Sequence, residues 1–557
     1  MSADRTSSLR IALAQLNPTV GDLEGNAALA RRARAEAAAG GADLIVFSEL
    51  FITGYPPEDL IGKPAFIQAA HKTVETLARD TADGGPAMLI GTPWPGDGKP
   101  YNSVALLDQG VVVDVRHKVD LPNYGVFDEK RVFATGSMPG PLNFRDIRLG
   151  LPICEDIWSE DVCECLAETG AEMLLVPNGS PFTLNKHEIR MGHSVGRVTE
   201  TGLPLAYVNQ IGGQDELAFD GASFVLNPGG RLAVQMPAWQ EQVTLTDWTR
   251  GPEGWRCEPG ETVLLEEGDA AIYRACVLGL RDYVEKAGFP GVVLGLSGGI
   301  DSALVAAMAV DALGAARVHC IMLPYRYTSN ESLADASACA EALGVRYDIV
   351  PIAPPVEGFG ESLAKLFEGR DPDITEENLQ SRTRGTILMA VSNKFGSMLL
   401  TTGNKSEVSV GYATLYGDMN GGFNPIKDLY KMQVYALARY RNAALPGGVL
   451  GPQGVVIPEN IITKAPTAEL REGQKDQDSL PPYDELDDIL QSLVDHEMPV
   501  VEIVKRGHAP ETVRKVERLL YLAEYKRRQS APGVKITSRH FGRDRRYPIT
   551  NKFRENP

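Results

Sequence analysis

Short apolar runs recur through the first half of the chain, from Leu9 to about Leu245. The runs are RIALAQL, ADLIVFSE, PAMLIGT, SVALLD, VVVDVRHK, IRLGLPIC, AEMLLVPN, PLAYVNQ and ASFVLNP. Runs of this length and composition predict β-strands, and helical patterns lie between some of them, at Asn26 to Ala39 and Phe66 to Ala82. Several strands for each helix favour a layered α/β sandwich over a regular alternation.

Strand and helix alternate in the second half, after a loop from Arg250 to Gly268 that is rich in glycine, proline and charge. The pattern predicts, in order, a helix (Ala270 to Ala287), a strand (Gly291 to Leu296), a helix (Ser302 to Leu313), a strand (Arg317 to Leu323), a helix (Ser332 to Leu343) and a strand (Tyr347 to Ile352). This alternation predicts a doubly wound parallel sheet. We therefore expect a first domain over 1–250, a linker over 251–268 and a second domain over 269–557.

Composition and charge narrow the function classes. A chain of 557 residues exceeds the size of one hydrophobic core, which supports two domains. The net charge of −18 argues against a general nucleic-acid surface. No apolar run is long enough for a membrane span, and the N-terminus lacks the apolar stretch of a signal peptide. Seven cysteines without paired CxxC units suit a reducing compartment, so we expect a cytoplasmic protein.

Three predicted strands of the first domain end in a residue that can act on an amide bond. Glu49 lies in LIVFSELFITGYPPED, Lys118 in VVVDVRHKVDLPNYGVFDEKRVF and Cys154 in LGLPICEDIW. Strand ends of an open α/β sheet converge on one crevice. A thiol can then attack the carbonyl carbon, the glutamate can carry the proton, and the lysine can stabilise the oxyanion and lower the pKa of the thiol. Each residue alone has an ordinary structural interpretation, but together they predict an amidase site.

These three segments, in this order, resemble the nitrilase or carbon–nitrogen hydrolase superfamily, which uses a Glu-Lys-Cys triad on an αββα sandwich. The resemblance implies that Glu49 is the general base, Lys118 the lysine and Cys154 the nucleophile. Glu129 matches a second, supporting glutamate of many members. Positions in LPNYGVFDE and NGSPFTLNKHEIR match the glutaminase branch, which implies that glutamine is held by Tyr124, Glu129, Ser180 and Lys186.

A glycine-rich loop in the second domain is the predicted phosphate site. The strand GVVLGL runs directly into SGGIDS and then into a helix, so backbone N–H groups and the helix N-terminus face an anion. The loop is neither a Walker A loop nor a GxGxxG motif. It resembles the ATP pyrophosphatases of the adenylating amidotransferases, which split ATP between the α and β phosphates. That resemblance implies ATP contacts at Gly295, Leu296, Ser297, Gly298, Gly299, Ile300, Asp301 and Ser302, with magnesium on Asp301.

Three later segments resemble the NAD synthetase family. They are TEENLQSRTRG, LLTTGNKSEVSVGYATLYGDMNGGFNPIKDLYK and KAPTAEL. The match implies that ATP is also bound by Thr402, Lys431 and Thr467. It implies that deamido-NAD is bound by Asn378, Arg382, Glu407 and Lys526, with Glu407 as a second magnesium position. The basic C-terminal stretch that contains Lys526 is expected to be mobile and to close over the dinucleotide phosphates.

The two resemblances together imply a ligase that amidates deamido-NAD through an acyl-adenylate. Ammonia would come from glutamine, and the other products would be AMP, pyrophosphate and glutamate. Members of the family are usually homo-oligomers that pair through the synthetase domain. No nucleic-acid or membrane partner is expected.

Two alternatives remain at this stage. The first is an amidotransferase with the same ATP loop that makes GMP or asparagine. Asparagine synthetases carry a cysteine at position two, where this chain has Ser2, and GMP synthetases use an unrelated glutaminase. The second is a scaffold built on degenerate domains. Such a protein should have lost part of one site, whereas Glu49, Lys118, Cys154 and Asp301 are all present.

Overall fold

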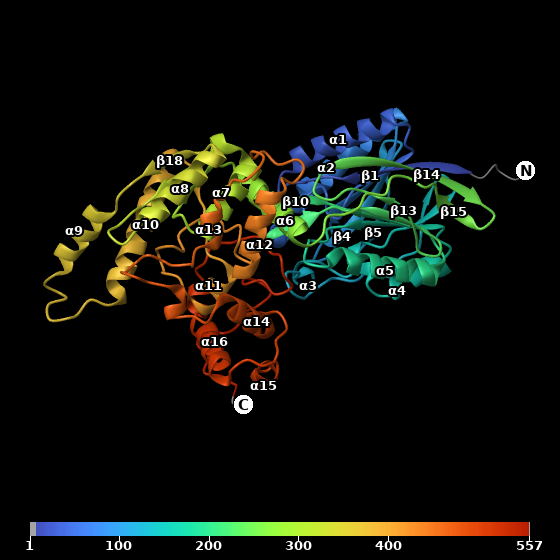
Figure 1. The fold of residues 1–557 in the computed structure, drawn as a ribbon. Coiled ribbons are helices and arrows are strands. Elements are labelled where there is room, and N and C mark those ends of the chain that lie inside the picture. The colour runs from blue at the N-terminus through green and yellow to red at the C-terminus, as the bar shows by residue number, and fades with distance from the viewer. Residues whose placement is uncertain (1–6, 556–557) are drawn as a thin grey trace, which may run out of the picture. The chain divides into compact units, whose positions relative to one another are not determined.

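A computed structural model of the chain describes residues 7–555, so Ser2 lies outside the described residues. The chain divides into two compact units, Met1–Glu266 and Glu267–Pro557. Figure 1 colours the first unit from blue to green and the second from green to red.

Two sheets form the centre of the first unit. The seven-stranded sheet has the order β15 (Gly254–Cys257), β14 (Gln242–Gly251), β1 (Ser8–Gln15), β2 (Leu44–Val46), β3 (Ala87–Trp94), β4 (Tyr101–Asp108) and β5 (Val111–His117). The six-stranded sheet has the order β13 (Arg231–Gln235), β12 (Phe224–Asn227), β9 (Leu205–Asn209), β8 (Met173–Asn178), β7 (Ile147–Gly150) and β6 (Leu142–Phe144). β1 pairs with β2 in parallel and with β14 antiparallel.

Helices cover the outer faces of these sheets. α1 (Leu23–Ala39) and α2 (Pro64–Asp80) pack against the seven-stranded sheet, while α4 (Asp161–Glu168) and α5 (Lys186–Thr201) pack against the six-stranded sheet. A further apolar cluster joins β1, β2 and β3 to β7, β8 and β9. Because strand side chains alternate between faces, each sheet contributes to an inner and an outer cluster. The expected αββα sandwich is confirmed.

Smaller elements complete the first unit. The hairpin of β10 (Ile211–Gln214) and β11 (Leu217–Asp220) is separate from both sheets. The short helices are α3 (Glu129–Val132), η1 (Glu58–Gly62), η2 (Thr81–Asp83) and η3 (Cys154–Ile157).

The segment that we expected as a linker is partly ordered into the first unit. β15 pairs with β14, and Trp255 and Cys257 are buried. Both side chains belong to the cluster between the two sheets. The sequence interpretation gave too little weight to one tryptophan and one cysteine among many polar residues, although two buried side chains suffice to hold a short hairpin against a sheet.

The second unit is built on a four-stranded parallel sheet in the order β18 (Arg346–Ile349), β17 (Val318–Met322), β16 (Val292–Gly295) and β19 (Met398–Leu399). The elements that precede or connect these strands are α6 (Gly268–Lys286), α7 (Ile300–Leu313), η4 (Ala315–Arg317), α8 (Asn330–Leu343), α9 (Ala353–Leu363) and α10 (Ile374–Phe395). Apolar side chains of α9 and α10 pack on one sheet face, and α7 and α8 contact β16, β17 and β18. The expected doubly wound parallel sheet is confirmed.

The rest of the second unit is helical. Its elements are α11 (Lys405–Val410), α12 (Lys431–Ala443), α13 (Glu459–Thr463), η5 (Asp476–Asp478), α14 (Tyr483–Val494), α15 (Val500–Lys505), α16 (Pro510–Leu522) and α17 (Glu524–Arg527). α11, α14, α15 and α16 share one apolar cluster. Within residues 7–555, no helix combines the length and apolar character that crossing a bilayer requires.

Candidate active sites

The ends of three strands in the first unit bring Glu49, Lys118 and Cys154 together. Glu49 follows β2, Lys118 follows β5 and Cys154 begins η3 after β7. All three side chains are buried. The Lys118 ammonium donates hydrogen bonds to Glu49 Oε1 at 2.7 Å and to Glu129 Oε2 at 2.9 Å. The convergence inferred from the strand ends is therefore present in the fold.

Charge and burial set the resting protonation of this site. Burial opposes the charge of Lys118, but the carboxylates of Glu129 and Glu49 raise the pKa of that ammonium well above its ordinary value. Burial and the charge of Glu49 raise the pKa of the Cys154 thiol well above its ordinary value, and Lys118 offsets only part of this shift. We expected Lys118 to lower the pKa of the thiol. Burial reverses the net direction, so the thiol is neutral at rest and needs a base.

Glu49 is fixed by groups that the sequence interpretation missed. Asn102 Nδ2 donates to Glu49 Oε1 at 2.7 Å, and the backbone N–H of Gly179 donates to Glu49 Oε2 at 2.9 Å. Tyr55 donates from its hydroxyl to Glu129 Oε1 at 2.8 Å. Burial raises the pKa of Glu129, while Lys118 opposes that rise. The sequence feature that could have identified Asn102 is a polar amide side chain within the otherwise apolar strand β4.

The predicted glutamine contacts surround the turn that begins at Cys154. The Tyr124 hydroxyl donates to Glu155 Oε1 at 2.9 Å. Lys186 places its ammonium 4.2 Å from the ring centroid of Trp158, at the other end of the same turn. Both predicted residues therefore contact neighbours of the nucleophile.

Ser180 lies next to Gly179 and is buried. Its hydroxyl accepts a hydrogen bond from Arg190 Nε at 3.0 Å, and the Arg190 guanidinium is paired with Asp220 at 2.8 Å. Arg190 thereby holds the backbone that supplies the Gly179 N–H group to Glu49. Sequence reasoning missed Arg190 because its partner comes from the distant β11 strand.

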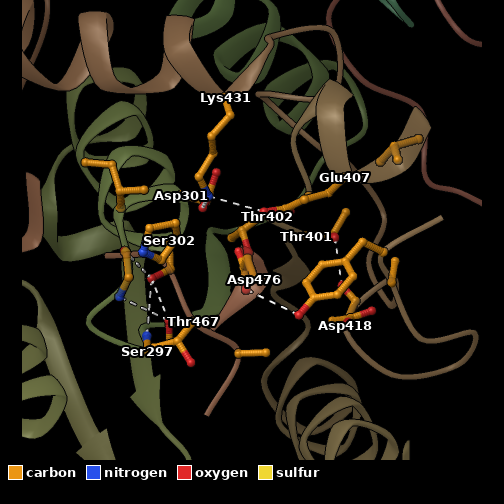
Figure 2. Close-up of a pocket in the computed structure, with 18 of the residues that line it drawn as sticks. Ser297, Asp301, Ser302, Thr401, Thr402, Glu407, Asp418, Lys431, Thr467 and Asp476 are labelled. Carbon is orange, nitrogen blue, oxygen red and sulfur yellow. Dashed lines mark hydrogen bonds and ion pairs between the residues drawn. The ribbon is translucent and has the colours of Figure 1, made fainter. Parts of the chain in front are cut away.

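The phosphate loop of the second unit opens onto a cavity of about 240 Å³. Figure 2 shows this cavity with Ser297, Asp301 and Ser302 on one side and Lys431 and Glu407 on another. The predicted ATP contacts that line it are Ser297, Gly299, Ile300, Asp301, Ser302, Thr402, Lys431 and Thr467, and Glu407 lines it as well. These residues come from four separate chain segments, so the fold brings together what the sequence keeps far apart.

Three predicted loop positions do not line the cavity. Gly295 ends β16, and Leu296 is buried beside it with its N–H bonded to Ile321. Gly298 has a φ of +78°, and a Cβ at this position would meet the Ser332 carbonyl oxygen at 2.4 Å. Only glycine fits this turn, which lets the loop pass tightly against α8.

One cation joins two carboxylates in this cavity. The Lys431 ammonium lies 2.5 Å from Asp301 Oδ2 and 3.2 Å from Glu407 Oε1. Asn404 Nδ2 donates to the other oxygen of Asp301 at 2.8 Å. Burial raises the pKa of Glu407 to about 8, against the lowering effect of Lys431. Burial opposes the charge of Lys431, but both carboxylates raise the pKa of its ammonium.

A second cavity, of about 360 Å³, contains Asn378, Arg382 and Lys526, three of the predicted deamido-NAD contacts. Lys526 Nζ donates to the carbonyl oxygens of Gly411 and Ala413 at 2.8 and 2.7 Å. The residues that line both cavities are Tyr412, Ala413, Asp418 and Ala468. The two cavities therefore adjoin. Three of the four predicted deamido-NAD contacts line the second cavity, whereas the fourth, Glu407, lines the phosphate cavity with the predicted ATP contacts.

Asp418 is an acid that the sequence interpretation treated only as part of a turn. It accepts a hydrogen bond from the Thr414 N–H at 2.7 Å, and burial raises its pKa to about 6. Figure 2 labels it on the wall of the first cavity, and it also lines the second. Across 7–555, no group of three or more His, Cys, Asp or Glu side chains is placed to hold a metal ion.

The C-terminal stretch packs against the rest of the second unit. Ser530 and Ala531 line the phosphate cavity. The backbone N–H groups of Ile536 and Thr537 both donate to Asp428 Oδ2, at 2.7 and 2.6 Å. The stretch is rich in Arg and Lys, but its apolar residues Val534, Ile536 and Phe541 are buried in the core. The segment therefore forms part of the cavity wall.

Comparison with known proteins matches one family model to each unit. The carbon-nitrogen hydrolase family matches residues 10–251, and the NAD synthase family matches residues 272–530. The chain is 52% identical over 550 residues to the glutamine-dependent NAD(+) synthetase of Rhodobacter capsulatus, covering 99% of this chain and 100% of that protein. It is 42% identical over 579 residues to the enzyme of that name from Thermotoga maritima, covering 98% and 99% of the two chains.

A solved structure resembles the whole chain as well. It is the glutamine-dependent NAD+ synthetase from Acinetobacter baumannii in complex with adenosine diphosphate, with 43% identity and a TM-score of 0.78. The match covers 99% of this chain and 100% of that one. These matches extend over both units and both candidate sites, and the chain belongs to the family of glutamine-dependent NAD(+) synthetases.

Proposed function

We propose that this chain makes NAD by ATP-driven amidation of deamido-NAD, using ammonia that its first unit releases from glutamine. The observation that carries the proposal is a pair of adjoining cavities in the second unit, which most of the predicted ATP and deamido-NAD contacts line. A phosphate loop opens into one cavity, and the other contains Asn378, Arg382 and Lys526. This arrangement suits a reaction between a nucleoside triphosphate and a larger substrate bound beside it. Family membership supports the same reaction.

Glutamine hydrolysis in the first unit follows from the resting charges. Because the thiol of Cys154 is neutral, Glu49 takes its proton while the sulfur adds to the carboxamide carbon. The Lys118 ammonium stabilises the oxyanion that forms. Glu49 then gives the proton to the departing nitrogen, and ammonia leaves a thioester. Water, deprotonated by Glu49, adds to the thioester carbon; the carbon–sulfur bond breaks, glutamate leaves, and Glu49 returns the proton to the Cys154 sulfur.

Amidation in the second unit begins with attack of the pyridine carboxylate of deamido-NAD on the α-phosphorus of ATP. This forms an acyl-adenylate and releases pyrophosphate. The backbone N–H groups of the SGGIDS loop and the N-terminus of α7 bind the pyrophosphate charge, and Lys431 adds a cation. Ammonia then attacks the acyl carbon, AMP leaves, and the amide of NAD is formed.

We propose that Asp301 and Glu407 hold magnesium when ATP binds. Magnesium prefers hard oxygen ligands and binds through one or two carboxylates together with substrate phosphates. Both side chains line the phosphate cavity and contact Lys431. Because burial raises the pKa of Glu407 to about 8, magnesium would displace a proton from Glu407 as it binds. This donor set fits the ion, which would neutralise charge on the leaving pyrophosphate.

We also propose a cytoplasmic homo-oligomer that pairs through the second unit. Every residue of α9 is half-buried or exposed. Exposed apolar side chains on and around α9 and α10 are Phe359, Leu366, Phe367, Ile374 and Phe395. Light scattering on the parent and on Leu366→Asp tests the oligomer, because a charge in an apolar interface should favour smaller species.

The cysteines support the proposed cytoplasmic location. All seven are free thiols, as expected in a reducing compartment.

The proposed activity is tested by NAD formation from deamido-NAD, ATP and magnesium, with glutamine or ammonium as nitrogen donor. We expect Cys154→Ala to lose glutamine-driven synthesis and to keep ammonia-driven synthesis. If the parent makes no NAD with either donor, the assignment of the acceptor is wrong. Pyrophosphate release with other carboxylates, such as those that lead to GMP or asparagine, then separates another amidotransferase from an inactive scaffold.

A further inference from the structure

A buried carboxylate outside the proposed chemistry joins the segments that carry Lys118 and Cys154. Asp156 is 1% exposed. Its Oδ2 accepts a hydrogen bond from the N–H of Ile153 at 2.9 Å. Its Oδ1 accepts from the N–H groups of Val119 and Asp120, at 3.0 and 2.8 Å. One side chain thus holds the two backbones at once.

Two of the three donors lie next to Cys154 and Lys118 in the chain. Ile153 immediately precedes Cys154, and Val119 immediately follows Lys118. The N–H of Asp156 also donates to the Ile153 carbonyl at 3.0 Å, which closes the turn around the nucleophile. A change in the Asp156 carboxylate would therefore shift the backbone of Ile153 and of Val119, and each of these residues is directly bonded to Cys154 or Lys118.

The turn at Cys154 needs such support because its backbone is strained. Cys154 has a φ of +47°, in the left-handed region that a residue with a Cβ rarely occupies because it is strained there. This conformation persists only where neighbouring groups hold it. Asp156 provides that support from within the turn and links it to the end of β5.

We propose that Asp156 is a positioning residue of the glutaminase reaction, which sets the Cys154 thiol against the Lys118 ammonium by tying their backbones together. The inference rests on the glutaminase activity proposed for the first unit. Asp156 does not contact the reacting atoms. It acts through the placement of the nucleophile and of the group that stabilises the oxyanion, where small displacements have large effects on rate.

Asp156→Asn tests this role with little change in size. The amide retains one acceptor oxygen and replaces the other with a donor, which then faces a backbone N–H and leaves it without an acceptor. We expect kcat for glutamate release from glutamine to fall at least about tenfold, since misplacement of about 1 Å costs on that order or more. KM for glutamine should change less than about threefold, because Tyr124, Ser180 and Lys186 are untouched.

Two further measurements separate positioning from a general loss of structure. The rate at which iodoacetamide alkylates Cys154 should shift to higher pH in Asp156→Asn, because the Lys118 ammonium no longer favours the thiolate as strongly. Ammonia-driven NAD synthesis should match the parent. The control is Ser159→Ala, which removes the 2.8 Å hydrogen bond from Ser159 to Asp120 but leaves the Asp156 contacts in place. We expect this control to keep its glutaminase kcat within about twofold.

Three results would overturn the inference. One is a kcat in Asp156→Asn within twofold of the parent. Another is an equal fall in kcat for Ser159→Ala. The third is loss of the near-ultraviolet circular dichroism of the first unit in Asp156→Asn, which would make Asp156 a general folding residue. If the parent releases no glutamate from glutamine, the proposed function itself fails, and that outcome is distinct from all three.

Discussion

The ammonium of Lys431 lies 2.5 Å from a carboxylate oxygen of Asp301. The phosphate cavity therefore already contains a cation, placed against a carboxylate, that can pair with phosphate charge when ATP binds. The same ammonium reaches Glu407 at 3.2 Å. We expect Lys431→Met to lower NAD formation at least about 100-fold with either nitrogen donor, because a buried cation that stabilises phosphate charge is lost. Glutamate release from glutamine should continue.

Pyrophosphate release from ATP and deamido-NAD measures this effect directly. Lys505→Met is the control, because Lys505 is an exposed lysine of the same unit that pairs with nearby Glu502. A Lys431→Met protein that lost glutamine-driven synthesis alone would contradict a role for Lys431 at the phosphates.

Gly179 has room for a hydrogen atom only. A Cβ at this position would lie 2.8 Å from the ring of Tyr55 and 3.2 Å from Glu49 Oε2. We expect Gly179→Ala to push Glu49 out of place and to lower glutaminase kcat at least about tenfold, with ammonia-driven synthesis unchanged. Gly192→Ala is a matched control in α5, where the added Cβ meets nothing within 4 Å beyond the neighbouring backbone of its own helix. Similar losses in both variants would refute the steric argument.

Arg382 lies in the second cavity, where its Nε donates to the Leu415 carbonyl at 3.2 Å. We expect Arg382→Ala to raise KM for deamido-NAD about 10-fold to 100-fold, the effect of losing one hydrogen bond to a charged group. KM for ATP should change less than threefold, since Arg382 does not line the phosphate cavity. Steady-state kinetics with ammonium as donor measures both constants. Equal changes in the two would place Arg382 outside the deamido-NAD site, and Arg346→Ala, at an exposed arginine, is the control.

His540 links the stability of the second unit to pH. Burial lowers the pKa of its imidazole to about 3, so it stays neutral in the folded state where an unfolded chain would be protonated. Between the unfolded pKa of about 6.5 and the folded pKa, the unfolded state binds more protons, and the free energy of unfolding falls as the pH falls. The limiting slope is about 1.4 kcal/mol per pH unit.

Urea unfolding of the parent and of His540→Gln at pH 7, 6 and 5 isolates this contribution. The parent should lose more stability than the variant on acidification, because glutamine does not titrate. If the free energy of unfolding changed with pH in the same way for both proteins, His540 would have the same pKa in the folded and unfolded states.

Much of the fold and part of each site could be predicted from the sequence. The helix expected from Ser302 to Leu313 runs from Ile300 to Leu313 in the structure. It could be predicted to within two residues because its apolar pattern is strong. Asn102 and Arg190 were missed because each acts through a partner far away in the chain, and one polar residue inside a strand or a helix carries no local sign of that partner. Asp418 was missed because its partner Thr414 lies in the same turn, so only its burial in the folded chain distinguishes it from an ordinary turn residue. Burial also reversed the expected pKa shift of Cys154, and burial is a property of the fold.

The wall formed by Ser530 and Ala531 has a consequence for the order of folding. The phosphate loop at Ser297 and this wall meet in one cavity although most of the second unit separates them in the chain. Contacts this distant form late, and domains emerge from the ribosome with the N-terminal one first. We therefore expect a growing chain to acquire its glutamine-cleaving centre well before its ATP site is closed. Ribosome-stalled chains of increasing length should release ammonia that they cannot yet use.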